Sequence, residues 1–152
     1  MENVGLMLDG SFAWYLTPPV EAKVYFRSLN SILPPGCVLY FEGLSIADNV
    51  VEFFRSKRPT KIQKVAINTL WPEPAFYHVK ANEENLEYLG KLLDDHTEDE
   101  ICDHFHIYDT DCMLVYWHDA FSDNQLVFSC RFDEEEIRRF CNLVGSEYHK
   151  ES

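Results

Sequence analysis

The sequence predicts a single α+β domain in which about four helices cover a mixed, mainly antiparallel sheet. Its 152 residues match the size of one domain, and 46% of them are hydrophobic, enough to bury a core. Helix and strand patterns alternate early in the chain, whereas the C-terminal part reads as a β-meander followed by a helix. No linker rich in Gly, Pro or Ser divides residues 1–152, so we expect one globular domain.

The first pattern surrounds the pair Asp9-Gly10. Asp-Gly supplies the positive φ angles of a type I′ turn, so Val4–Leu8 and Ser11–Leu16 are expected to form a β-hairpin. A short helix through the same residues remains an open alternative.

The next pattern predicts a helix over Val20–Leu33. Thr17 can cap it, and the two prolines that follow Thr17 suit a first helical turn. Residues 34–36, Pro-Pro-Gly, end this helix. Cys37–Phe41 is then a continuous apolar run, which is typical of a strand buried on both faces.

A second helix is expected to begin at Ser45, which forms a Ser-x-x-Asp capping box with Asp48, and to end before Pro59. Two strands follow it, over Val65–Leu70 and Phe76–Lys80.

The second half of the chain begins with a helix that Asn82 can cap. Three consecutive antiparallel strands are then expected, over Phe105–Asp109, Cys112–His118 and Gln125–Phe132. The last helix has the clearest signals, since Asp133 and Glu136 form a capping box and Gly145 ends the apolar periodicity.

Acidic residues outnumber basic ones by 26 to 13, a formal net charge of −13. Residues 83–111 alone contain 11 acids and one base. Such a field repels phosphate groups and anionic lipids, so we expect neither a nucleic-acid nor a membrane partner. It attracts a basic protein instead. Five bases between Arg55 and Lys64 offer the alternative of ion pairs within the chain.

Several other classes are excluded. The longest apolar run, Cys112–Trp117, is far shorter than the roughly 20 residues that a membrane helix needs. The sequence has no Gly-x-Ser-x-Gly elbow, P-loop or Gly-rich dinucleotide loop. Five cysteines without a CxxC pair, and no signal-peptide pattern, predict reduced thiols and a cytoplasmic location. Acidic neighbours disfavour a thiolate at Cys102.

Residues 102–119 contain side chains that bind metals. The two-residue period of a strand puts His104, His106 and Tyr108 on one face. The two histidines can share an ion, with His118 or Asp119 at the end of the neighbouring strand as a third ligand. A metal-binding protein, or a hydrolase that uses a divalent transition metal at this His/Asp/Cys segment, is therefore the alternative function. The alternative is that these histidines bind no metal and simply lie on an exposed strand face that tolerates them.

The main functional prediction is a non-enzymatic interaction domain without a cofactor. Acids attract the basic partner in this hypothesis, and loop aromatics anchor it, a composition typical of protein-binding hot spots. The residues assigned to this surface are Glu98, Asp99, Glu100, Asp103, Trp117, Asp119 and Phe121. A solvated acidic surface with aromatics that close the core, or a weak homodimer through strand-edge aromatics, are the alternatives.

In size, acidity, expected thiol state and lack of catalytic motifs, the chain is similar to bacterial immunity and inhibitor proteins, which mask basic sites on toxins. This resemblance lies in the overall profile and involves no particular residue. It implies a basic toxin or nuclease as the partner.

Overall fold

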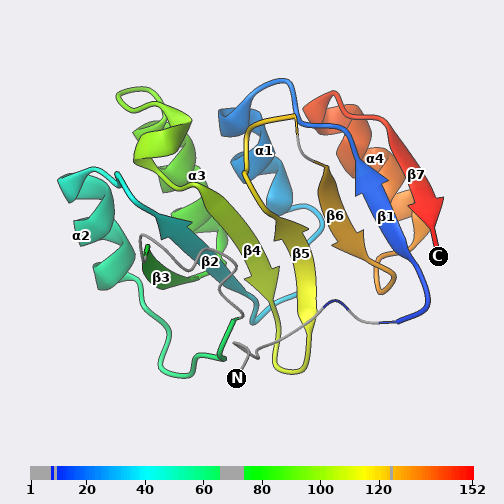
Figure 1. Ribbon diagram of the computed structural model, residues 1–152, viewed down its shortest axis with the longest axis horizontal. Coiled ribbons are helices and arrows are strands. Elements are labelled where there is room, and N and C mark those ends of the chain that lie inside the picture. The colour runs from blue at the N-terminus through cyan, green and yellow to red at the C-terminus, as the bar shows by residue number, and fades with distance from the viewer. Residues whose placement is uncertain (1–7, 9, 66–73, 124) are drawn as a thin grey trace.

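The computed structural model describes residues 8, 10–65, 74–123 and 125–152. Seven strands form one sheet in the order β3-β2-β4-β5-β6-β1-β7, and all neighbouring strands are antiparallel (Figure 1). The strands are β1 (Ala13–Leu16), β2 (Val38–Gly43), β3 (Ala75–Lys80), β4 (His104–Tyr108), β5 (Met113–Trp117), β6 (Leu126–Ser129) and β7 (Tyr148–Glu151). The helices are α1 (Ala22–Leu29), α2 (Asp48–Ser56), α3 (Glu83–Leu92), α4 (Glu134–Val144) and a short 3₁₀ helix, η1 (Glu98–Glu100). This architecture confirms the predicted α+β class.

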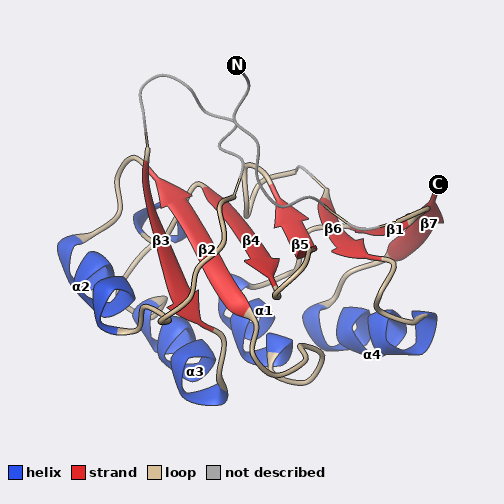
Figure 2. Ribbon diagram, turned by 90° about the horizontal axis from the view of Figure 1, so that it is seen from below, coloured by secondary structure: helices blue, strands red, loops and turns tan. Residues whose placement is uncertain are grey.

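All four α-helices pack on one face of the sheet, so the fold has two layers (Figure 2). The main core lies between these layers and is dominated by aromatic side chains. Its largest fully buried members include Tyr25, Phe26, Phe41, Phe105, Trp117, Phe128 and Phe140. Rings of this size contribute most of the hydrophobic burial in a small domain.

The opposite face of the sheet carries no helix within the described residues, yet its central side chains are also buried. β4 shows the predicted alternation, because Phe105 and Ile107 point into the main core while Tyr108 joins a second apolar cluster. The Tyr108 hydroxyl accepts a hydrogen bond from the main-chain N–H of Gln63 at 3.0 Å. The segment after α2 therefore covers part of this second face.

A row of parallel rings crosses the centre of the second face. His106 lies between its cross-strand neighbours Tyr40 on β2 and Tyr116 on β5. The ring centroids are 5.8 Å apart for Tyr40 and His106, and 4.5 Å apart for His106 and Tyr116. Cross-strand ring pairs of this kind stabilise a sheet beyond their burial alone.

Two helices begin as the sequence predicts. Asn82 caps α3 by accepting a hydrogen bond from the main-chain N–H of Asn85 at 2.8 Å. At α4, Asp133 and Glu136 form the expected capping box, and Gly145 ends the helix with a φ of 76°. Only a left-handed residue satisfies the last carbonyl groups in this way, which explains the glycine.

The other two predicted helix caps are wrong. The hydroxyl of Thr17 accepts from the main-chain N–H of Glu147 at 2.9 Å, so Thr17 extends the pairing of β1 with β7. Helix α1 begins later, after Glu21, without a side-chain cap. Ser45 does not cap α2 either, since the N-cap residue is Ala47, whose N–H donates to the carbonyl of Glu100 at 3.0 Å.

The predicted N-terminal hairpin is also wrong. Residues 4–7 lie outside the described residues, but β1 is paired with β6 on one side and with β7 on the other, which leaves no edge for a hairpin partner. Leu8 instead forms an isolated parallel bridge with Met113. Most of the predicted strand Val65–Leu70 lies outside the described residues. The sequence does not predict strand β7, which follows the last helix.

No helix among the described residues is long and apolar enough to cross a membrane. All five cysteines carry free thiols, and four of them are buried.

Candidate functional site

A cavity lies at one end of the sheet, where β2 ends, β4 begins and β5 ends. It has a volume of about 840 Å³ and is open to solvent. Its lining comes from the end of β2, from η1 and the start of β4, and from the loop after β5. These lining residues are Leu44, Glu98, Asp99, Cys102, Asp103, His104, His118, Asp119, Ala120, Phe121, Ser122 and Asp123.

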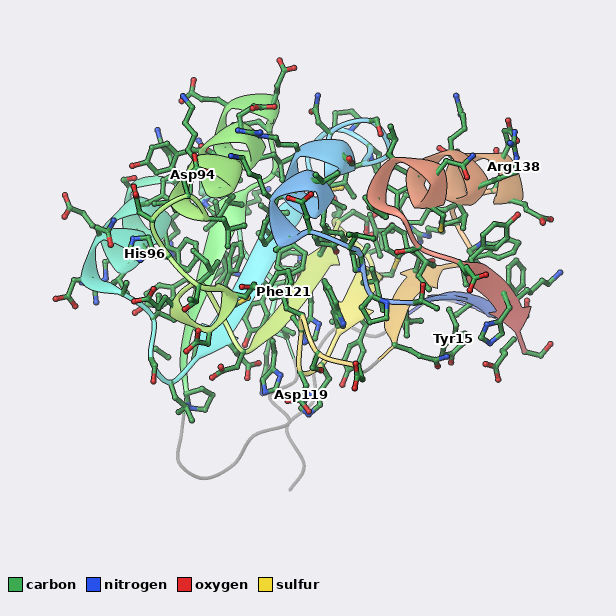
Figure 3. All side chains as sticks on the ribbon, turned by 90° about the horizontal axis from the view of Figure 1, so that it is seen from above. Tyr15, Asp94, His96, Asp119, Phe121 and Arg138 are labelled. Atoms are coloured by element: carbon green, nitrogen blue, oxygen red, sulfur yellow. The ribbon has the colours of Figure 1, made fainter. Side chains whose placement is uncertain are left out.

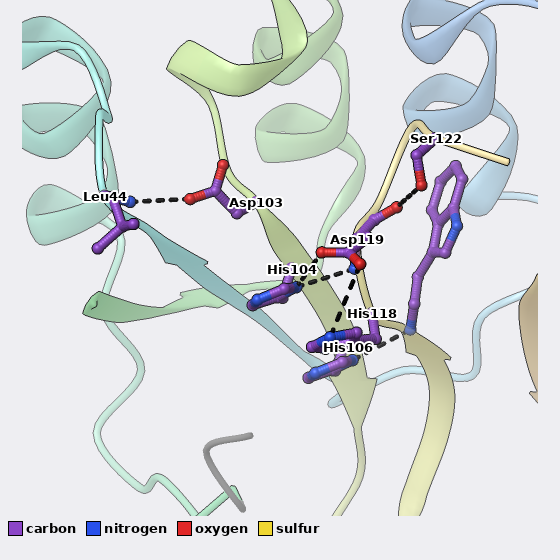
Figure 4. Close-up of polar contacts among 8 residues, drawn as sticks. Leu44, Asp103, His104, His106, His118, Asp119 and Ser122 are labelled. Atoms are coloured by element: carbon purple, nitrogen blue, oxygen red, sulfur yellow. Dashed lines mark hydrogen bonds and ion pairs between the residues drawn. The ribbon is translucent and has the colours of Figure 1, made fainter. Parts of the chain in front are cut away.

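The loop after β5 forms one wall and is held in a strained conformation. Asp119 and Phe121 both have positive φ, at 52° and 66°. The main-chain N–H of Asp119 donates to Nδ1 of His104 at 2.9 Å, and the hydroxyl of Ser122 donates to the carbonyl of Asp119 (Figure 4). Phe121 packs on Trp117, with ring centroids 4.8 Å apart. Strained residues persist only where such contacts hold them.

The side chains of Asp119 and Phe121, two residues of this loop, point in opposite directions. Phe121 faces the helical layer, whereas Asp119 lies on the far side of the sheet (Figure 3). The loop therefore presents a carboxylate to the cavity while its aromatic ring anchors it in the core.

Asp103 fixes the opposite wall. Its Oδ2 accepts from the main-chain N–H of Leu44 at 3.0 Å, and its own N–H donates to the carbonyl of Glu42 at 2.7 Å. Glu100 closes the capping box of η1 with Thr97. The carboxylates of this wall are thus carried on a segment tied to the end of β2.

The cavity is strongly acidic. Five carboxylates line it, from Glu98, Asp99, Asp103, Asp119 and Asp123, and no Lys or Arg is among the described residues of the lining. Much of the remaining negative charge of residues 83–111 is matched by ion pairs. These pairs are Glu84 with Lys57, Glu87 with Arg27, Asp94 with Lys23 and Asp109 with Arg131. Of the basic residues 55–64, Lys57 forms the kind of ion pair that the sequence offers as an alternative, with Glu84 and not with an acid of the cavity.

Two imidazole rings form the floor between the walls. His104 and His118 stack with their centroids 4.0 Å apart and their planes 8° from parallel. Burial lowers the pKa of His104, and the neighbouring His118 lowers it further, against the opposing effect of Asp119 and Asp103. Nδ1 of His104 accepts a main-chain N–H, so the proton of the neutral ring is on Nε2.

The proposed metal ligands are only partly brought together. His104, His118 and Asp119 each place one ligand atom within 4.8 Å of the others. His106 lies apart from them, fully buried, and its Nδ1 accepts from the N–H of Trp117 at 3.1 Å. The rings of His104 and His118 also lie one above the other in nearly parallel planes. An ion binds in the plane of an imidazole at about 2.0–2.1 Å, so one of the two rings has to turn before both bind one ion.

A buried carboxylate lies beside these imidazoles. Glu42 is the cross-strand neighbour of His104, and its side chain is 1% exposed. Its Oε2 accepts from the hydroxyl of Tyr40 at 2.7 Å, but among the described residues its Oε1 has no hydrogen-bond partner. Burial raises the pKa of Glu42, while the Tyr40 hydrogen bond and His118 oppose that shift.

The thiol in the cavity lining is not a suitable nucleophile. Cys102 is 2% exposed, and burial together with the nearby Asp103 raises its pKa well above the ordinary value. A thiolate is therefore disfavoured there, as the acidic neighbours in the sequence predict.

The structure brings together most of the predicted partner surface and removes one member. Glu98, Asp99, Asp103, Asp119 and Phe121 all line the cavity, with Glu100 beside them in η1. Trp117 does not. It is fully buried in the main core, because the alternation along β5 turns it inward between Tyr116 and His118, and so it cannot touch a partner.

Sequence reasoning missed Leu44, Asp123 and Glu42. The first two become part of the site through loop positions that carry no motif, but a glutamate inside the apolar run of β2 is a signal that could have been used. No protein-family model, no curated protein and no solved structure matches this chain.

Proposed function

We propose that the protein is a non-enzymatic interaction domain that binds a basic partner protein through the acidic cavity. The observation that supports this most directly is the concentration of five carboxylates around one hollow, with no lysine or arginine among the lining residues that the structure describes. Charge of one sign in a concave surface focuses the field and speeds association with an oppositely charged partner. A basic toxin or nuclease, masked by this surface, is the kind of partner that we infer.

The same proposal includes a reducing compartment such as the cytoplasm. Five free thiols in a chain of this size support it, since buried cysteines behave there as small apolar side chains.

The test is capture of a partner by the pure protein from an extract of its own cells, at low and then at high salt. The variant Glu98→Gln/Asp123→Asn removes two exposed cavity charges and is expected to weaken the captured complex about fivefold at low salt. The control Glu52→Gln/Glu147→Gln removes two exposed charges elsewhere and should leave binding unchanged. Equal effects of the two variants, or no retained protein at either salt concentration, would contradict the proposal.

A second candidate is a transition-metal site, which the grouping of His104, His118 and Asp119 favours. The side chain of His118, one of the two rings that would bind the ion, is 36% exposed. On this hypothesis, zinc or nickel should bind at micromolar concentration by calorimetry and raise the melting temperature of protein purified without a histidine tag. The variant His118→Ala should abolish both effects. If the wild-type protein shows neither effect, this candidate is rejected.

A further inference from the structure

The carboxylates of the cavity stand on two opposite walls. Asp103 and the acids of η1 belong to the segment before β4, whereas Asp119 and Asp123 belong to the loop after β5. Main-chain hydrogen bonds hold both walls, so the carboxylates are placed before any partner arrives. A cation that donates hydrogen bonds in several directions can contact both walls at once. A guanidinium group has five N–H donors in one plane, whereas an ammonium group is a compact point charge.

A flat surface lies between these walls. His118 stacks on His104 with one face and is 36% exposed in its side chain. A guanidinium group stacks on planar rings and is less strongly hydrated than an ammonium group, so it loses less solvation in a partly enclosed site. Leu44 at the rim is 54% exposed and provides an apolar contact for the methylene groups of a long side chain.

Glu42 provides an independent indication of a cationic ligand. It is an almost completely buried carboxylate with an unpartnered oxygen, and it adjoins two residues of the cavity floor and wall, His104 by strand pairing and Asp103 through the bonded main chain. A buried polar atom without a partner is costly and calls for an explanation. A cation bound above the imidazoles would lie close to this carboxylate and would balance its charge.

We propose that the cavity binds the guanidinium group of an arginine side chain in preference to the ammonium group of lysine. The inference rests on the proposed function and specifies the chemistry that this site recognises. Glu42 acts in it as a positioning charge behind the imidazole floor and not as a direct ligand.

The experiment titrates the ¹⁵N-labelled protein with N-acetyl-arginine methylamide and, separately, with the lysine analogue. The arginine probe is expected to bind about fivefold more tightly, with the largest amide shifts in residues 103–104 and 118–123. His118→Ala should reduce the affinity for arginine to that for lysine. Glu42→Gln, which keeps an acceptor for Tyr40, should weaken both probes, whereas the exposed control Glu52→Gln should weaken neither.

Equal or tighter binding of the lysine probe would overturn the preference and leave the proposed function standing, because that function requires only a basic partner. Amide shifts spread over exposed acids outside the cavity, such as Glu134, or no binding of either probe, would also overturn it. The capture experiment with the Glu98→Gln/Asp123→Asn variant would then decide the proposed function by itself. Amide spectra of each variant report whether it keeps the native fold.

Discussion

Lowering the pH from 7 to 5 is expected to reduce the free energy of unfolding by about 4 kcal/mol through two buried histidines, His78 and His106. Burial lowers the pKa of His106 from 6.5 to about 3, and the pKa of His78 to about 4. Nδ1 of His106 accepts from the N–H of Trp117, so this ring fits its site in the neutral form. Nδ1 of His78 shares a hydrogen bond of 2.8 Å with the hydroxyl of Tyr108.

The sign of the effect follows from proton binding. Between pH 6.5 and the two lowered pKa values, the unfolded chain is protonated at these histidines and the folded chain is not, so stability falls as the pH falls. At pH 5 the difference is about 1.5 pH units for each ring, or about 2 kcal/mol each at about 1.36 kcal/mol per unit. The raised pKa of Glu42 acts in the opposite direction, because that group stabilises the fold at low pH and loses this contribution as the pH rises.

The variant His106→Asn separates this effect from general acid unfolding. Asparagine can accept the N–H of Trp117 but does not titrate, so the fall in stability between pH 7 and 5 should shrink by about half. Urea unfolding at several pH values measures it, and the comparison uses slopes because the lost stacking with Tyr40 and Tyr116 lowers stability at every pH. The exposed His149→Asn is the control. An unchanged slope in His106→Asn would show that His106 gains its proton at the same pH in the folded and the unfolded chain, and would contradict the prediction.

The fold was predictable where local signals and tertiary packing agree. The amphipathic pattern and capping box of α4 specify that helix completely, and the alternation of β4 places Phe105 and His106 on opposite faces. Thr17 shows where local signals fail. A threonine before two prolines is a good helix cap, but the Thr17 hydroxyl instead accepts from the main-chain N–H of Glu147, just before β7 and 130 residues further along the chain. No local pattern contains that partner.

The candidate site was predictable for a similar reason. Asp103, Asp119 and Phe121 are close in the fold because β4 and β5 are consecutive antiparallel strands, so the loop after one meets the segment before the other. Leu44 and Glu42 come from β2, whose place beside β4 depends on the strand order of the whole sheet. The sequence leaves that order open.

From composition, the sequence predicts that Trp117 belongs to the partner-binding surface, but the geometry of β5 places it in the core. Its indole is 0% exposed and packs against Tyr25 and Phe121, with centroid distances of 5.2 Å and 4.8 Å. Trp117→Ala is therefore expected to cost about 3–5 kcal/mol in unfolding free energy, because it removes a large ring from a closed core and leaves a cavity.

The matched variant is Phe121→Ala, in the adjoining loop. Phe121 is only partly buried, so its loss removes less buried area and should cost less than half as much as that of Trp117. Denaturant unfolding of both variants at pH 7 measures the difference. Similar stabilities would mean that Trp117 contributes no more packing than a loop ring, and an exposed anchoring role for it would again be open. A large difference assigns Trp117 to the core that positions the strained loop, and leaves recognition to the carboxylates and imidazoles of the cavity.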